Sequence, residues 1–125
     1  SIQVFPNFIQ ALSNLGAALN KLNKPDEAIP YLERTIHLDP AFAMAHYNLG
    51  NAYFAKNQHK QALASYEKAA ELGLDFLSLH WNLFEIHKKE GRTQDAVKEL
   101  KLILEIDPND EKAQKLLKEM RGSKK

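Results

Sequence analysis

The tripeptide Asn48-Leu49-Gly50 has a counterpart on each side of it in the sequence. Asn14-Leu15-Gly16 precedes it and Asn82-Leu83-Phe84 follows it at the same distance, so a 34-residue period runs through the chain without an insertion. Self-similarity at a fixed period of this length is typical of stacked supersecondary units, none of which can bury its apolar face alone. The period therefore predicts a repeat architecture, and it favours binding over catalysis.

Each 34-residue unit carries two apolar stripes with helical spacing, separated by a short polar break. In the second unit the stripes are Ala45, Leu49, Ala52 and Tyr53, then Ala62, Leu63, Tyr66 and Ala69. The three breaks are Asn23-Lys24-Pro25, Asn57-Gln58-His59 and Glu90-Gly91-Arg92. Pro25 suits the first turn of a helix, and Gly91 can adopt the left-handed conformation that ends one. Each unit is therefore predicted to be a helical hairpin.

The order of residue types resembles the tetratricopeptide repeat (TPR) family. The matching positions of the second repeat are Leu49, Gly50, Tyr53, Ala62, Tyr66 and Ala69. The third repeat has Phe84 in place of the close-packing glycine, and Leu74 replaces the closing proline of the second. We therefore expect altered helix spacing between the second and third repeats. The resemblance implies an all-α, right-handed superhelical TPR solenoid of antiparallel helix pairs.

The 34-residue register also sets the expected boundaries. We expect TPR repeats over residues 9–42, 43–76 and 77–110, a C-terminal capping helix over 111–121 and a flexible tail over 122–125. Residues 1–8 fall in the register of an earlier repeat. We therefore interpret them as the remnant of a preceding repeat in a longer TPR protein.

The composition is that of a folded helical protein. With 44% hydrophobic residues, 26% charged residues and a net charge of +1, the chain is predicted to bury a core in one compact unit, and it lacks the strong basic bias of a nucleic-acid-binding module. No apolar run is long enough to enter and cross a bilayer. Cysteine is absent, which excludes thiolate chemistry but does not fix the compartment, so a cytoplasmic location is only the default.

The resemblance to TPR arrays implies a concave groove lined by the first helix of each pair, in which an extended or helical peptide of a partner protein lies. The candidate groove residues are Asn14, Asn48, Asn82, Tyr47, Asn51, Phe54, Trp81 and Lys88. The principal predicted function is accordingly that of a protein-interaction scaffold.

Two interpretations are open for these candidates. The ladder Asn14, Asn48 and Asn82 offers one carboxamide per repeat, which can hold successive backbone amides of a peptide or can simply bond a neighbouring helix. Tyr47, Phe54 and Trp81 are rigid aromatics of the kind that anchor partners, or they pack between hairpins. Lys88 lies near the groove's lip and favours an acidic ligand, but scattered helix lysines are usually solvated.

A chaperone-binding site and an enzymatic site are both disfavoured. TPR domains that grip the C-terminal carboxylate of Hsp70 or Hsp90 use several charged donors, and at the matching positions only Asn48 fits, the others being Ser13, Ala17, Ser78 and Asn82. His80 and His87 are two helical turns apart instead of one, so we interpret them as core or boundary histidines, not as a metal or acid–base site. We therefore expect no catalysis, metal or cofactor in this chain.

The alternative function is structural. If the array is uncapped at its N-terminal end, the first hairpin presents an apolar face, and such a face favours homo-oligomer formation. In that case the chain acts in assembly, through its ends or its convex face, and the groove is idle.

Overall fold

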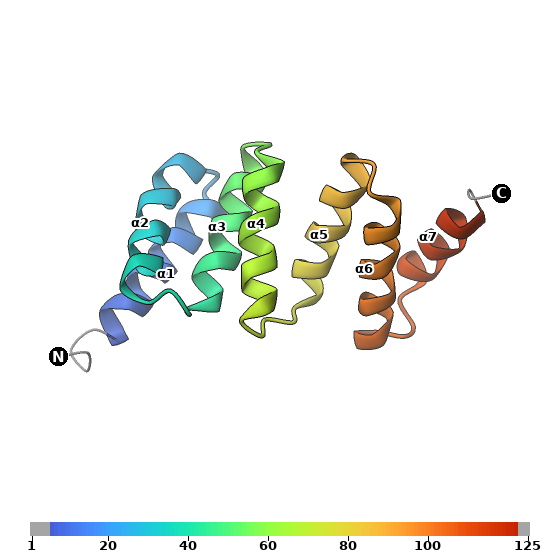
Figure 1. The fold of residues 1–125 in the computed structure, drawn as a ribbon. Helices are drawn as coiled ribbons and strands as arrows, with labels where there is room; N and C mark the ends of the chain where they lie inside the picture. Colours follow the sequence, from blue (N-terminus) through green and yellow to red (C-terminus); the bar gives the residue numbers. More distant parts are fainter. Residues whose placement is uncertain (1–5, 123–125) are drawn as a thin grey trace. The chain divides into compact units, whose positions relative to one another are not determined.

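A computed structural model describes residues 6–122, and this part of the chain consists of seven α-helices joined by short turns (Figure 1). The helices are α1 (Pro6–Lys21), α2 (Pro25–Leu38), α3 (Ala43–Ala55), α4 (His59–Glu71), α5 (Leu77–Lys89), α6 (Thr93–Ile106) and α7 (Glu111–Gly122). Residues 6–122 contain no strand. The predicted all-α class, built from paired helices, is confirmed.

The contacts group the chain into two compact units, one ending at Leu74 and the other beginning at Asp75. In the first unit α1 packs against α2, α2 against α3 and α3 against α4, and α1 also contacts α3. In the second unit α6 lies between α5 and α7 and packs against both. The expectation of one compact unit was therefore wrong. Helices of a repeat array contact mainly their neighbours in sequence, so no central core has to join all repeats.

The helices follow the 34-residue register of the sequence. The second helices α2, α4 and α6 begin at Pro25, His59 and Thr93, and each start lies one full period after the previous one. The helices α3, α5 and α7 begin at Ala43, Leu77 and Glu111, with the same spacing. The terminal helix α7 therefore occupies the place of a first helix of a further pair, as the register predicts.

The turns within the pairs share one backbone conformation. Asn23 and Asn57 each have φ of 62° and Gly91 has φ of 75°, so a left-handed residue ends every first helix of the three pairs. The next amide then donates five residues back, as in the bond from Gln58 N–H to the Tyr53 carbonyl at 2.9 Å. This arrangement satisfies terminal carbonyls of the helix, and asparagine and glycine adopt the conformation at low cost.

The cores of the helix pairs are filled in two ways. A Cβ atom added at Gly16 would lie 2.5 Å from Leu32, and one added at Gly50 would lie 2.7 Å from the ring of Tyr66, so both glycines are required for close packing. In the third pair Phe84 stands at this position and is buried. It joins a core that also contains Ala96, Leu100, Ile103 and Ala113.

Two ends of the predicted layout are only partly described. Helix α1 begins at Pro6, three residues before the expected start of the first repeat at 9, and α7 continues through Gly122. Residues 1–5 and 123–125 lie outside the described residues. The interpretation of residues 1–8 as a remnant of an earlier repeat stays a prediction.

Candidate functional site

The three ladder asparagines lie on α1, α3 and α5 but differ in exposure. Asn14 is exposed, and its Oδ1 accepts a hydrogen bond of 3.0 Å from Gln10 Nε2 on the same helix. Asn48 is only 6% exposed, and Asn82 is half-buried. The backbone carbonyl of Asn48 also accepts a bond of 2.9 Å from Asn20 Nδ2, which links α1 to α3. Equal spacing in the sequence thus does not give equal access to a ligand.

Three of the predicted residues of α3 gather around one buried ring on α4. The Tyr66 hydroxyl donates to Asn51 Oδ1 at 2.5 Å, and the ring centroid lies 5.9 Å from that of Tyr47 and 6.5 Å from that of Phe54. Tyr66 itself is fully buried, whereas Tyr47 and Phe54 are half-buried. Tyr66 therefore fixes the positions of both aromatic rings, a role that its place in the apolar stripe of the sequence did not reveal.

The second unit has an aromatic pair of its own, with a lysine on each ring. Trp81 meets Phe84 edge-on, with ring centroids 5.7 Å apart and planes at 89°. Lys112 Nζ lies 4.8 Å from the centroid of Trp81, and Lys88 Nζ lies 5.9 Å from that of Phe84. Trp81 is half-buried and Phe84 is buried. Lysine over an aromatic ring is a favourable cation–π arrangement.

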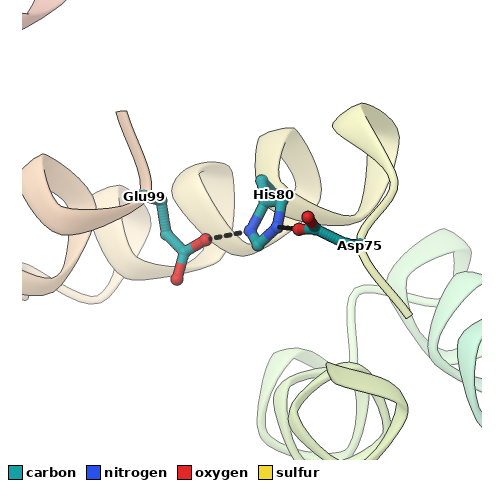
Figure 2. Close-up of polar contacts among 3 residues, drawn as sticks. All are labelled: Asp75, His80 and Glu99. Atoms are coloured by element: carbon teal, nitrogen blue, oxygen red, sulfur yellow. Dashed lines mark hydrogen bonds and ion pairs between the residues drawn. The ribbon is translucent and has the colours of Figure 1, made fainter. Parts of the chain in front are cut away.

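His80 lies between two carboxylates, both from the second unit (Figure 2). Its Nδ1 is 2.7 Å from Glu99 Oε1, and its Nε2 is 2.6 Å from Asp75 Oδ1. The side chains of His80 and Glu99 are 7% and 12% exposed, while that of Asp75 is 69% exposed. Since a carboxylate only accepts, both ring nitrogens must donate, and the imidazole is then positively charged.

The surroundings of His80 favour that charged form. The hydrogen bond to Glu99 is the main cause that raises the pKa of His80 above its ordinary value, and the bond to Asp75 acts in the same direction. Burial opposes both by disfavouring the charge, but the net direction of the pKa shift is upward. The arrangement fastens α5 to α6 and to the segment before α5, and it uses up both ring nitrogens.

The interpretation of His80 and His87 as core histidines fits their burial, but only His80 is fully bonded. Both are 6% exposed, yet among the described residues His87 Nδ1 has no hydrogen-bond partner. Glu99 was missed in the sequence because it lies 19 residues from His80. A signal existed, since Glu99 occupies the register position that the buried Ser65 holds one repeat earlier. Within residues 6–122 no three histidine, aspartate or glutamate side chains are grouped as a metal site requires.

The remaining predictions concern a carboxylate clamp and a membrane. Of the residues at the clamp positions, Ser13 is buried on α1 and Asn48 is buried on α3. The absence of an Hsp70 or Hsp90 clamp stays a prediction. None of the described helices combines the length and the apolar composition that crossing a membrane needs.

Comparison with known proteins identifies the fold family. Models of the tetratricopeptide repeat match residues 13–75 and 55–120. A search of curated protein sequences gives no match.

Solved structures of TPR proteins are similar to this chain over nearly its full length. YrrB, described as a TPR protein with an unusual peptide-binding site, is 24% identical with a TM-score of 0.79, covering 94% of this chain and 64% of YrrB. The first TPR of Spaghetti (RPAP3), solved with the HSP90 peptide SRMEEVD, is 22% identical with a TM-score of 0.80 and coverages of 92% and 91%.

The Yersinia enterocolitica type III secretion chaperone SycD, solved with a peptide of the translocator YopD, is 18% identical with a TM-score of 0.83 and coverages of 95% and 96%. At these identities the likeness concerns the fold, while the two repeat models together span most of the helices described above. The chain therefore belongs to the tetratricopeptide repeat family.

Proposed function

We propose that the chain is a protein-interaction module that binds an extended or helical peptide on the first helices of its pairs. The observation that carries the proposal is the state of Trp81, a half-buried ring on α5 whose orientation is fixed by edge-on packing against buried Phe84. A rigid, partly exposed aromatic loses little conformational entropy on binding, and such residues supply most of the energy at recognition surfaces.

The first unit offers a matching feature on α3. Tyr47 and Phe54 are half-buried and packed on Tyr66, so they too are rigid while part of each ring remains exposed. Tyr47 lies one repeat before Trp81, at the same register position. We assign to Tyr47, Phe54 and Trp81 the contacts with apolar side chains of the peptide.

The polar residues divide into ligand contacts and structural supports. Asn14, Asn82 and Lys88 are exposed or half-buried, and we assign them to polar groups of the peptide. Asn48 is nearly covered, and Asn51 is bonded to Tyr66, so we assign both of them to holding the helices in place. Within the asparagine ladder, Asn14 and Asn82 are thus assigned to peptide binding and Asn48 to bonding a neighbouring helix, the two roles that the sequence left open.

The decisive experiment is capture of peptides from a random display library by the wild-type chain and by the variants Trp81→Ala and Tyr47→Ala. The matched control is Tyr31→Ala, which removes an exposed aromatic from α2, a second helix of a pair. We expect enrichment by the wild type and the control, and its loss in at least the Trp81 variant. If no peptide is enriched by a wild type that circular dichroism shows to be folded, the proposed function is wrong.

A second candidate function is self-association through the first hairpin. Among the described residues, five of the seven exposed large hydrophobic side chains fall between Phe8 and Leu38, namely Phe8, Leu15, Leu22, Tyr31 and Leu38. Phe8 and Leu15 lie seven residues apart on α1, as on one face of a helix that packs against another helix, and Leu22 follows in the turn after α1. Light scattering at rising concentration tests this candidate, and Leu15→Glu should abolish any dimer that forms.

A further inference from the structure

Two lysines in the second unit, Lys88 and Lys112, lie over aromatic rings. Among residues 6–122, the ion pairs include Lys56 with Asp26, Arg92 with Glu90, and His80 with its two carboxylates, but neither Lys88 nor Lys112 takes part in one. Both side chains are exposed. A ring face satisfies an ammonium group only weakly, so each lysine retains donors for an anionic ligand.

Lys112 is held in place by the packing of its own helix. The next residue, Ala113, is fully buried in the core that contains Phe84, and Leu116, Leu117 and Met120 pack against the same core. Lys112 also occupies the register position that Ser78, a first-helix residue, holds one repeat earlier, and α7 begins one period after α5. Helix α7 thus covers the core with one face and carries Lys112 over Trp81 beside it.

We propose that Trp81, Lys88 and Lys112 form a binding site for an acidic peptide segment. The two ammonium groups pair with side-chain carboxylates of the segment, and the exposed part of Trp81 packs against an apolar residue between them. This inference rests on the proposed peptide-binding function and names the chemistry of its ligand. It also gives α7 a part in binding in addition to its part in covering the core.

The ligand carboxylates are those of aspartate or glutamate side chains and not a chain terminus. A terminal carboxylate is held when several donors converge on one point. Here the two lysines lie on different rings, one on Trp81 and the other on Phe84, whose centroids are 5.7 Å apart. Separate cations beside an aromatic surface suit separate anionic side chains, so an amidated C-terminus on the peptide should not matter.

Glu85 is an acidic residue close to the two lysines, so it can be used to test whether the ligand is acidic. It is half-buried on α5, one helical turn after Trp81 and one turn before Lys88, so it lies on the same side of that helix. Its negative charge opposes an acidic ligand. Replacing it with glutamine should therefore strengthen binding, whereas removing a lysine should weaken it.

The test uses a random 12-residue peptide display library, panned in parallel on the wild type and on Lys88→Gln/Lys112→Gln. The control is Lys98→Gln/Lys101→Gln, which removes the same charge from two exposed positions of α6. The most enriched wild-type peptide is then synthesised with an amidated C-terminus, together with a version in which glutamine and asparagine replace its acids. Binding is followed by the fluorescence of Trp81, the only tryptophan in the chain.

We expect acidic peptides from the wild type and the control, and neutral ones from the Lys88→Gln/Lys112→Gln variant. The double substitution should weaken binding of the acidic peptide about tenfold, because an exposed charge pair contributes only modestly to binding, and Glu85→Gln should strengthen binding. If the wild type selects neutral peptides that still require Trp81, the acidic-ligand inference is wrong while the proposed function stands. If the wild type selects nothing, both are wrong.

Discussion

The second and third helix pairs fill the same register positions with different side chains. In α3–α4 a glycine, Gly50, faces a tyrosine, Tyr66, whereas one repeat later Phe84 and Leu100 stand at these two positions. The aromatic side chain thus lies on the second helix of the pair in α3–α4 and on the first helix in α5–α6. Cores tolerate such exchanges when total volume is roughly maintained. The repeat therefore specifies a filled helix pair and not a fixed residue at each position.

The polar residues of the two pairs differ in the same way. His46 and His80 occupy the same register position of successive repeats, and both are buried. His46 donates through Nε2 to the carbonyl of Pro40 at 2.9 Å, while His80 contacts Glu99 and Asp75. One histidine thus bonds a neutral backbone group and the other two carboxylates. The third pair consequently has a charge-dependent link between its helices.

The largest effect is expected from removing the ring that distinguishes the third pair. Phe84→Ala should lower the free energy of unfolding of the second unit by about 3 to 5 kcal/mol, because it leaves a cavity among buried residues. Urea unfolding followed by Trp81 fluorescence measures this. Ile106→Ala, which shortens an exposed side chain of α6, should cost about 1 kcal/mol or less. Equal losses in the two variants would refute the core role of Phe84.

The next effect concerns the charged link of His80. His80→Gln should lower the free energy of unfolding by about 2 to 3 kcal/mol at pH 6. The substitution removes hydrogen bonds to charged groups and leaves the largely buried carboxylate of Glu99 without its histidine partner. The cost should shrink as the pH rises. The pKa of folded His80 is raised, mainly by the hydrogen bond to Glu99. Protonated His80 therefore contributes its full stabilisation at pH values below the pKa of the unfolded imidazole, about 6.5, and this contribution is lost as the pH rises through the pKa of the folded state.

The pH dependence is checked by urea unfolding of the wild type at intervals between pH 6 and 9. Glu99→Gln should reduce the dependence because it removes the main cause of the raised pKa of His80. Glu105→Gln, at an exposed position of the same helix, serves as the control and should leave it unchanged. A wild type whose stability does not fall across this range, relative to His80→Gln, would contradict the charged link.

A smaller effect is expected from adding one methyl group to the second pair. Gly50→Ala should cost about 1 to 3 kcal/mol, because its Cβ would lie 2.7 Å from the Tyr66 ring. Gly122→Ala, where nothing lies within 4 Å of an added Cβ, should be close to neutral. In Gly50→Ala/Tyr66→Leu the combined loss should be less than the sum of the single losses, as measured by thermal unfolding with circular dichroism.

The smallest effect tests a bond that the third pair lacks, since Leu100 has no hydroxyl. Tyr66→Phe removes the bond to Asn51 and should cost about 1 kcal/mol. Tyr31→Phe removes a hydroxyl from an exposed tyrosine and should change the melting temperature little. A Tyr66→Phe variant as stable as the wild type would show that the bond contributes nothing net.

The candidate site was only partly predictable from the sequence. The 34-residue period places Trp81 and Tyr47 at equivalent positions, and both are half-buried. The same period makes Asn14 and Asn48 equivalent, yet Asn14 is exposed and Asn48 is buried beside α1. Exposure depends on the neighbours that pack around a residue, and a period contains no information about them.

Periodicity and turn residues were sufficient to predict where the paired helices of this protein begin and where the chain turns. The starts of α2, α4 and α6, and the left-handed residues Asn23, Asn57 and Gly91, follow the 34-residue spacing because helix formation and chain reversal depend on nearby residues. Only the tertiary structure brought Glu99 to His80 and Lys112 to Trp81. Those residues lie on different helices, and their meeting depends on how the helices pack.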